Sequence, residues 1–118
     1  MAKLYKTVRV VGQANAEVLE DLITSTDVEP VRVIAVYPYE VTSTRQADAF
    51  IRLYIEREKI AEIPCYIWMD DLAAKKYVTP PRLEIDREIP VGQTLICGLV
   101  SGGTASIFEI VIEYELTG

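Results

Sequence analysis

The run IFEIVIEYEL (107–116) alternates between apolar and polar residues along nearly its whole length. Successive side chains of a β-strand point to opposite faces, so this period predicts a strand with one buried face. The opposite face is acidic, yet it keeps Ile107 and Val111, which a fully solvated face would seldom carry. The buried set predicted by the parity is Phe108, Ile110, Ile112, Tyr114 and Leu116.

A second run, QTLICGLV (93–100), is apolar on both of its faces. The Ser-Gly-Gly-Thr stretch that follows it is typical of a turn. The pattern therefore predicts that the two runs form a β-hairpin joined by this turn. The two faces of 93–100 are Leu95, Cys97 and Leu99 on one side, and Ile96 and Val100 on the other.

Further runs rich in β-branched and aromatic residues, bounded by turn residues, predict additional strands. The segment 16–26 fits both the helix and the strand period, and we interpret it as irregular or as a short strand. The segment 65–78 is the one plausible helix, because two acids at 70–71 precede two lysines at 75–76, the order that a helix dipole favours. The additional strands predicted are 4–11, 31–41, 49–57, 58–64 and 82–89.

Seven or eight strands with turn signals at intervals of about 8–12 residues, and at most one short helix, indicate an all-β protein. Helices do not alternate with the strands, so antiparallel pairing is predicted. The chain contains no internal repeat, linker or low-complexity segment. The sequence therefore predicts one domain over residues 1–118, built as an antiparallel β-sandwich.

Apolar residues on both faces of a strand require a second cover besides the core. In 31–41 the same pattern recurs, with Val33 and Ala35 on one side and Ile34 and Val36 on the other. Loops or the segment 65–78 could cover the second face, or a second subunit could cover it. Alternatively, the outward apolar residues are single exposed side chains, which need no cover. The residues predicted for a subunit interface are Ile34, Val36, Ile96, Val100, Ile107 and Val111.

The residue types needed for catalysis are scarce. The chain has no histidine, so a serine or cysteine nucleophile would lack its usual base. The two cysteines, Cys65 and Cys97, lie far apart in sequence, and the chain has too few Cys and His residues for a zinc site. We interpret them as free buried thiols rather than a disulfide. Acidic residues line strand faces, where solvation explains them better than glycosidase or calcium chemistry. We therefore expect no enzyme activity and no metal or other cofactor.

The net charge is -6, with 12 Lys and Arg against 18 Asp and Glu. An acidic surface is repelled by phosphate backbones, so nucleic acid is not an expected partner. No apolar run reaches the roughly 20 residues of a membrane helix, and residues 1–11 lack the apolar core of a secretion signal. We therefore expect no membrane partner and no secretion by that route.

Aromatic side chains are the remaining candidates for binding a ligand. If the segment 66–68 is extended, Tyr66 and Trp68 point to the same side. Such rings pack in cores, anchor protein interfaces or act as platforms for sugars. A carbohydrate- or ligand-binding module that uses Tyr66 and Trp68 is therefore the alternative function.

The strand pattern closed by EIPVGQTLICGLVSGGTASIFEIVIEYEL (88–116) resembles the jelly-roll structural and decoration proteins of phage and archaeal virus particles. The resemblance spans most of the chain as a pattern and carries no site residues over. It implies a jelly-roll sandwich and a non-enzymatic capsid or decoration subunit that forms homo-oligomers, with other particle proteins as further partners. It also implies location in the virion or in the cytoplasm. Carbohydrate-binding modules and tumour-necrosis-factor-like trimers have similar patterns, whereas cupins carry metal-binding histidines that this chain lacks.

Overall fold

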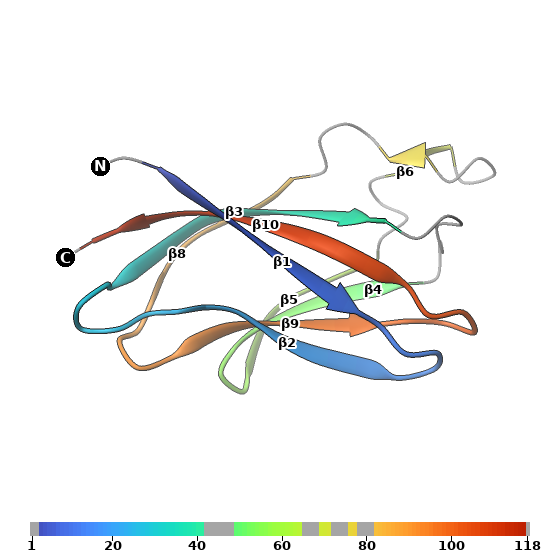
Figure 1. Ribbon diagram of the computed structural model, residues 1–118, viewed down its shortest axis with the longest axis horizontal. Coiled ribbons are helices and arrows are strands. Elements are labelled where there is room, and N and C mark those ends of the chain that lie inside the picture. The colour runs from blue at the N-terminus through green and yellow to red at the C-terminus, as the bar shows by residue number, and fades with distance from the viewer. Residues whose placement is uncertain (1–2, 42–48, 65–68, 72–75, 78–81, 118) are drawn as a thin grey trace.

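The strand-forming runs build two four-stranded antiparallel sheets, which appear as two layers in Figure 1. The structure is a computed structural model and describes residues 3–41, 49–64, 69–71, 76–77 and 82–117. The first sheet has the order β1 (Leu4–Val11), β10 (Ile107–Leu116), β3 (Val31–Glu40) and β8 (Leu83–Ile89). The second has the order β2 (Glu17–Thr24), β9 (Thr94–Val100), β4 (Phe50–Ile55) and β5 (Glu58–Pro64). The predicted all-β antiparallel sandwich is confirmed.

The strand pairs are nested from the outside of the chain inward. β1 pairs with β10, β2 with β9, β3 with β8, and β4 with β5. Two further pairings, β10 with β3 and β9 with β4, join these pairs into the two sheets. The backbone therefore runs as one long antiparallel ribbon that folds over on itself to give two layers.

The core lies between the two layers and contains mostly aliphatic side chains. The predicted inward parity of β10 is confirmed, because Phe108, Ile110 and Ile112 are fully buried while Tyr114 and Leu116 pack at the margin. β9 contributes the set that the sequence left open, since Leu95, Cys97 and Leu99 are each 0% exposed. The other faces of both sheets point outward, and they are the surfaces on which a binding site must be sought.

The predicted hairpin between 93–100 and 107–116 is wrong. Both strands exist, but β9 belongs to the second sheet and β10 to the first. The Ser-Gly-Gly-Thr stretch therefore connects the two layers instead of turning back within one sheet. Alternation along each strand depends on burial alone, whereas the choice of partner strand depends on distant parts of the chain.

A β-bulge in β3 overturns the predicted faces of 31–41. In the pairing with β10, Val33 lies opposite Tyr114 and Ala35 lies opposite Glu113, so Ile34 has no direct partner. An extra residue shifts the side-chain alternation by one position. Val33 and Val36 consequently share the core, and Val36 is 1% exposed. The placement of Val36 at a subunit interface is therefore wrong, and Ile34 is half-buried at the bulge itself.

The segment 65–78 contains no helix where the structure describes it. Two short strands, β6 (Met69–Asp71) and β7 (Lys76–Tyr77), pair there in an antiparallel way. The helix prediction is therefore wrong in these residues. The segment 16–26, interpreted as irregular or a short strand, holds the eight-residue strand β2. Tyr66 and Trp68, which carried the alternative function, lie outside the described residues, and so does Cys65.

Candidate functional site

The outer face of the first sheet carries a group of apolar side chains that spans three neighbouring strands. We call this group the apolar patch. Val11 lies opposite Ile107, and the Val41 N–H donates a hydrogen bond of 2.8 Å to the Ile107 carbonyl, so one apolar row crosses β1, β10 and the end of β3. Cross-strand neighbours of this kind have Cβ atoms about 5 Å apart. The members of the apolar patch are Val11, Tyr39, Val41, Ile107 and Val111.

Exposure distinguishes this patch from the core behind it. Val11 is 54% exposed, Tyr39 41% and Val41 38%, while Ile107 and Val111 are half-buried between them. Along β10, Ile107 and Val111 lie on the outward parity, whereas Phe108 and Ile110 point into the core. The alternation that builds the core therefore also fixes which residues of β10 face outward.

One ion pair lies within the apolar patch. Arg9 and Glu109 are directly opposite on β1 and β10, and the Arg9 Nη2 is 3.2 Å from the Glu109 Oε1. Tyr39 is the neighbour of Glu109 on the other side. The patch thus pairs its own positive and negative charge, although the whole chain has a net charge of -6.

Beyond the patch on the same face, Glu113 of β10 is a buried carboxylate, only 2% exposed. It accepts a hydrogen bond of 2.5 Å from the Tyr37 hydroxyl, and its Oε2 is 3.2 Å from the Lys3 Nζ. Arg82 donates to the Tyr37 hydroxyl at 3.1 Å and lies 3.9 Å from Glu113. The Tyr37 hydrogen bond, followed by Lys3 and Arg82, lowers the pKa of Glu113 against the opposing effect of burial.

Acid should therefore weaken this fold through Glu113. A carboxyl whose pKa is lowered by folding stabilises the protein above its unfolded pKa, about 4.3, and this contribution is lost as pH falls through the folded pKa. We expect Glu113→Gln to lower the melting temperature at pH 7 and the difference from the unsubstituted protein to shrink toward pH 3. Glu115→Gln, on the same strand, is the control, because the described residues give Glu115 no ion pair. A difference that stays constant with pH would contradict this role of Glu113.

The predicted interface residues are divided between the two outer faces. Ile107 and Val111 belong to the apolar patch, whereas Ile96 and Val100 lie half-buried on the outer face of the second sheet. There Val100 is opposite Phe50, and Ile96 is opposite Tyr54. The structure therefore does not bring the six predicted residues together, and one flat interface cannot contain all of them.

A polar network occupies the middle of the second outer face. The Tyr54 hydroxyl donates a 2.7 Å hydrogen bond to Glu17, and Arg52 lies 3.5 Å from the same carboxylate oxygen. The Arg52 Nε also donates to Glu62 at 2.6 Å, and Lys59 is 3.3 Å from Glu62. Burial, followed by the hydrogen bond to Glu17 and then the negative charge of Glu17, raises the pKa of Tyr54. Three strands, β2, β4 and β5, thus contribute to a connected set of side chains that faces away from the core.

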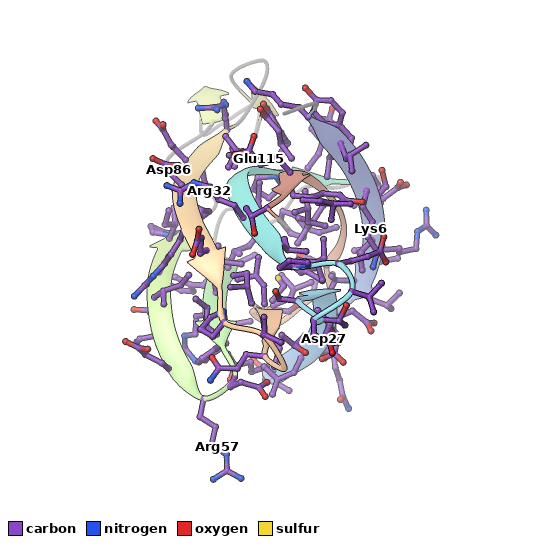
Figure 2. All side chains as sticks on the ribbon, turned by 90° about the vertical axis from the view of Figure 1, so that its left-hand side faces the viewer. Lys6, Asp27, Arg32, Arg57, Asp86 and Glu115 are labelled. Carbon is purple, nitrogen blue, oxygen red and sulfur yellow. The ribbon has the colours of Figure 1, made fainter. Side chains whose placement is uncertain are left out.

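A third candidate is a pocket of about 290 Å³ between the two layers, lined by Lys6, Glu29 and Tyr114 among others. Figure 2 faces this end of the sandwich and labels Lys6 on β1. Lys6 lies opposite Ile112 and so shares its core-facing parity, but β1 is an edge strand and Lys6 remains exposed. An inward-pointing charge on an edge strand prevents pairing with another strand, which accounts for Lys6 without a ligand.

Cys97 lacks the properties of a reactive thiol. Burial raises the pKa of the Cys97 thiol to about 12, so this cysteine stays protonated in the core. Among the residues that the structure describes, no three Cys, Asp or Glu side chains are grouped to hold a metal ion. The same part of the chain has no helix long and apolar enough to cross a membrane. The outer faces of the two sheets remain the candidate sites.

Comparisons of the chain with protein-family models, with curated proteins and with solved structures gave no match. Sequence reasoning missed Val11, Tyr39 and Val41, which complete the apolar patch. The alternation of β1 already placed Val11 with the polar residues Thr7 and Arg9, which was a signal for exposure. Only the order β1-β10-β3 shows that these residues adjoin Ile107.

Proposed function

We propose that this protein is a non-enzymatic assembly subunit that associates with copies of itself through the apolar patch. The observation that carries the proposal is the continuous apolar row of Val11, Ile107 and Val41, which crosses β1, β10 and the residue after β3 and is exposed at both ends. Scattered apolar residues are normal on a surface, but a contiguous group with a polar surround is typical of an interaction site. Burial of a valine or isoleucine side chain contributes about 1.5–3 kcal/mol before the costs of association.

A second copy of the chain is the partner that the charges favour. In a two-fold interface the same surface of both subunits meets itself. The apolar patch carries one arginine and one glutamate, Arg9 and Glu109, so a two-fold arrangement can place each near its opposite in the other copy. A partner with a strongly acidic or basic surface would find no excess of the opposite charge here.

The edges of the sheets are less suited to assembly than this face. β1 has the inward-facing Lys6, and β8 has a bulge at which Asp86 takes a φ of 47°. β2 has a bulge at Leu22, and β5 presents the exposed charges Lys59 and Glu62. Bulges and charges of this kind hinder strand addition at an edge. Association through a face is therefore favoured over growth of the sheets into a continuous fibre.

We further infer that the nested pairing is the winding of a jelly roll. A jelly roll has eight strands in two sheets formed by two Greek keys, and viral capsid and lectin domains use it. The pairs β1–β10, β2–β9, β3–β8 and β4–β5 support this inference. Together with the assembly face, it favours a role as a capsid or decoration protein of a virus particle, located in the virion.

The proposal predicts that a charge placed in the apolar patch dissociates the subunits without unfolding them. Val11→Lys should weaken self-association by about 100-fold, because each interface loses two apolar side chains and gains two like charges. Val91→Lys is the matched control, since Val91 is 58% exposed in the turn before β9 and Val11 is 54% exposed. Analytical ultracentrifugation over a concentration series would measure both constants.

The unsubstituted protein should form a dimer or larger assembly in this experiment, and Val91→Lys should do the same. Circular dichroism of Val11→Lys should remain that of a folded β protein. A monomeric unsubstituted protein at concentrations up to about 100 μM, well above the micromolar range of specific complexes, would reject the proposal.

A further inference from the structure

The outer face of the second sheet contains an open groove of about 260 Å³, on the side of the sandwich opposite the apolar patch. We call it the Tyr54 groove. It runs from β2 over β9 to the turn between β4 and β5. Its lining residues are Glu17, Leu19, Tyr54, Glu56, Arg57 and Ile96.

The floor of the Tyr54 groove depends on the absence of a side chain at Gly98. A Cβ atom at Gly98 would lie 3.0 Å from the Tyr54 Cε1 and would overlap the Glu17 carboxylate. The ring and the carboxylate can therefore lie close against the backbone of β9. An aromatic side chain that covers a glycine on the neighbouring strand is a recognised way to stabilise a sheet.

The two side chains over Gly98 are held in place by their own contacts. The Tyr54 hydroxyl donates to Glu17 at 2.7 Å, and Arg52 pairs with Glu17 at 3.5 Å. Arg52 is in turn fixed by Glu62 at 2.6 Å. Binding sites whose polar groups are already ordered lose less conformational entropy when a ligand binds.

The rim of the Tyr54 groove carries two charged side chains, those of Glu56 and Arg57. Glu56 and Arg57 form the turn between β4 and β5, and within the described residues neither side chain makes a hydrogen bond or ion pair. Glu56 takes a φ of 56°, a conformation that non-glycine residues seldom adopt. Figure 2 shows Arg57 projecting away from the body of the protein, where it is free to contact a ligand.

Apolar surface flanks the ring. Leu19 is 59% exposed on β2, and Ile96 is half-buried on β9. An aromatic ring beside aliphatic side chains suits the C–H faces of a sugar ring. The two carboxylates can accept hydrogen bonds from sugar hydroxyls, and the guanidinium can donate them.

From these observations we propose that the Tyr54 groove binds a neutral saccharide unit. The sugar ring packs on Tyr54, Leu19 and Ile96, and its hydroxyls bond to Glu17, Glu56 and Arg57. Arg52 already pairs with Glu17, and Glu56 lies beside Arg57 in the same turn, so the groove has no excess of positive charge with which to attract acidic sugars. The proposal does not depend on self-association, because it uses the opposite face of the sandwich.

The experiment is titration of the ¹⁵N-labelled protein with neutral oligosaccharides of glucose, galactose, mannose and xylose, followed by NMR and calorimetry. Oligogalacturonate serves as the acidic probe. At least one neutral series should shift the amide signals of β2, β9 and the β4–β5 turn, while oligogalacturonate should bind more weakly. Tyr54→Ala and Arg57→Ala should each weaken binding by about tenfold.

Tyr5→Ala is the matched control, because Tyr5 is an exposed tyrosine on the first sheet, 61% accessible. Its affinity for the sugar should equal that of the unsubstituted protein. If Tyr54→Ala unfolds, the exposed Arg57→Ala variant decides the question. The proposal is overturned if no neutral series binds, if only oligogalacturonate binds, or if Arg57→Ala binds unchanged.

Discussion

Leu99→Lys is expected to unfold the subunit, whereas Ile96→Lys should leave it folded. Both residues lie on β9, three positions apart, but they point to opposite sides of the second sheet. Leu99 is 0% exposed between the two layers, opposite Ile51 and beside Val18. An ammonium group there would have no partner, and the packing of the leucine would also be lost, at a combined cost of about 5–10 kcal/mol. A domain of this size has a total stability of about 5–15 kcal/mol.

Ile96→Lys replaces a half-buried residue on the outer face. A lysine there can lay its aliphatic stem on the sheet and keep its charge in water, so the loss should be about 1 kcal/mol or less. Urea unfolding followed by circular dichroism measures both variants. Similar losses of stability would mean that the assignment of the two faces of β9 is wrong.

The Ile96→Lys variant also tests which outer face of the sandwich mediates self-association. Self-association is proposed for the apolar patch on the first sheet, so Ile96→Lys should keep the oligomeric state of the unsubstituted protein. Dissociation of a folded Ile96→Lys variant would place the interface on the second sheet instead. Ile96 and Val100, which the sequence also predicted for an interface, would then be its centre.

Alternation along single strands was enough to predict the fold class and most of the long strands. The parity of β10 correctly placed Phe108, Ile110 and Ile112 in the core, because a two-residue period with one apolar face has only one stable orientation. The all-β class and the number of long strands followed from the same signal. These features depend on local residue order, which is fully contained in the sequence.

Features that depend on contacts between distant segments could not be predicted in this way. The bulge at Ile34 places Val36 in the core, and nothing in the run VRVIAVY marks the extra residue. The separation of β9 and β10 into different sheets likewise reflects their pairing with β4 and β3. The short loop between two clearly predicted strands favoured a hairpin. In the structure each of these strands pairs instead with strands distant in sequence, so the loop connects the two sheets.

The candidate sites follow the same division. Ile107, Val111 and Ile96 were identified because an apolar residue on an outward parity is visible in one strand. The apolar patch as a whole needs the lateral order β1-β10-β3, and the Tyr54 groove needs Gly98 beside Tyr54. Side chains that form a site across strands are separated in sequence by lengths that no local period records.

A second large effect is expected at Gly12, in the connection between β1 and β2. Its N–H donates a 2.7 Å hydrogen bond to the Ser106 carbonyl, just before β10 begins. A Cβ atom at this position would lie 2.7 Å from that carbonyl oxygen, 2.5 Å from the Ser101 Oγ and 3.1 Å from the Leu99 side chain. Ser101 and Ser106 belong to the connection between β9 and β10, and Leu99 lies near the end of β9.

Gly12→Ala should therefore destabilise the fold by about 1–3 kcal/mol, the usual cost of overpacking. The Ser106 carbonyl is backbone and cannot rotate away, and Ser101 is fixed because its Oγ accepts a hydrogen bond of 3.2 Å from the Ser106 N–H. Gly103→Ala is the control, since no atom lies within 4 Å of a Cβ at that position. It should leave stability unchanged or raise it slightly by restricting the unfolded chain. Thermal unfolding of both variants gives the comparison. Equal midpoints would show that a methyl group at position 12 fits between the β1–β2 and β9–β10 connections without a clash.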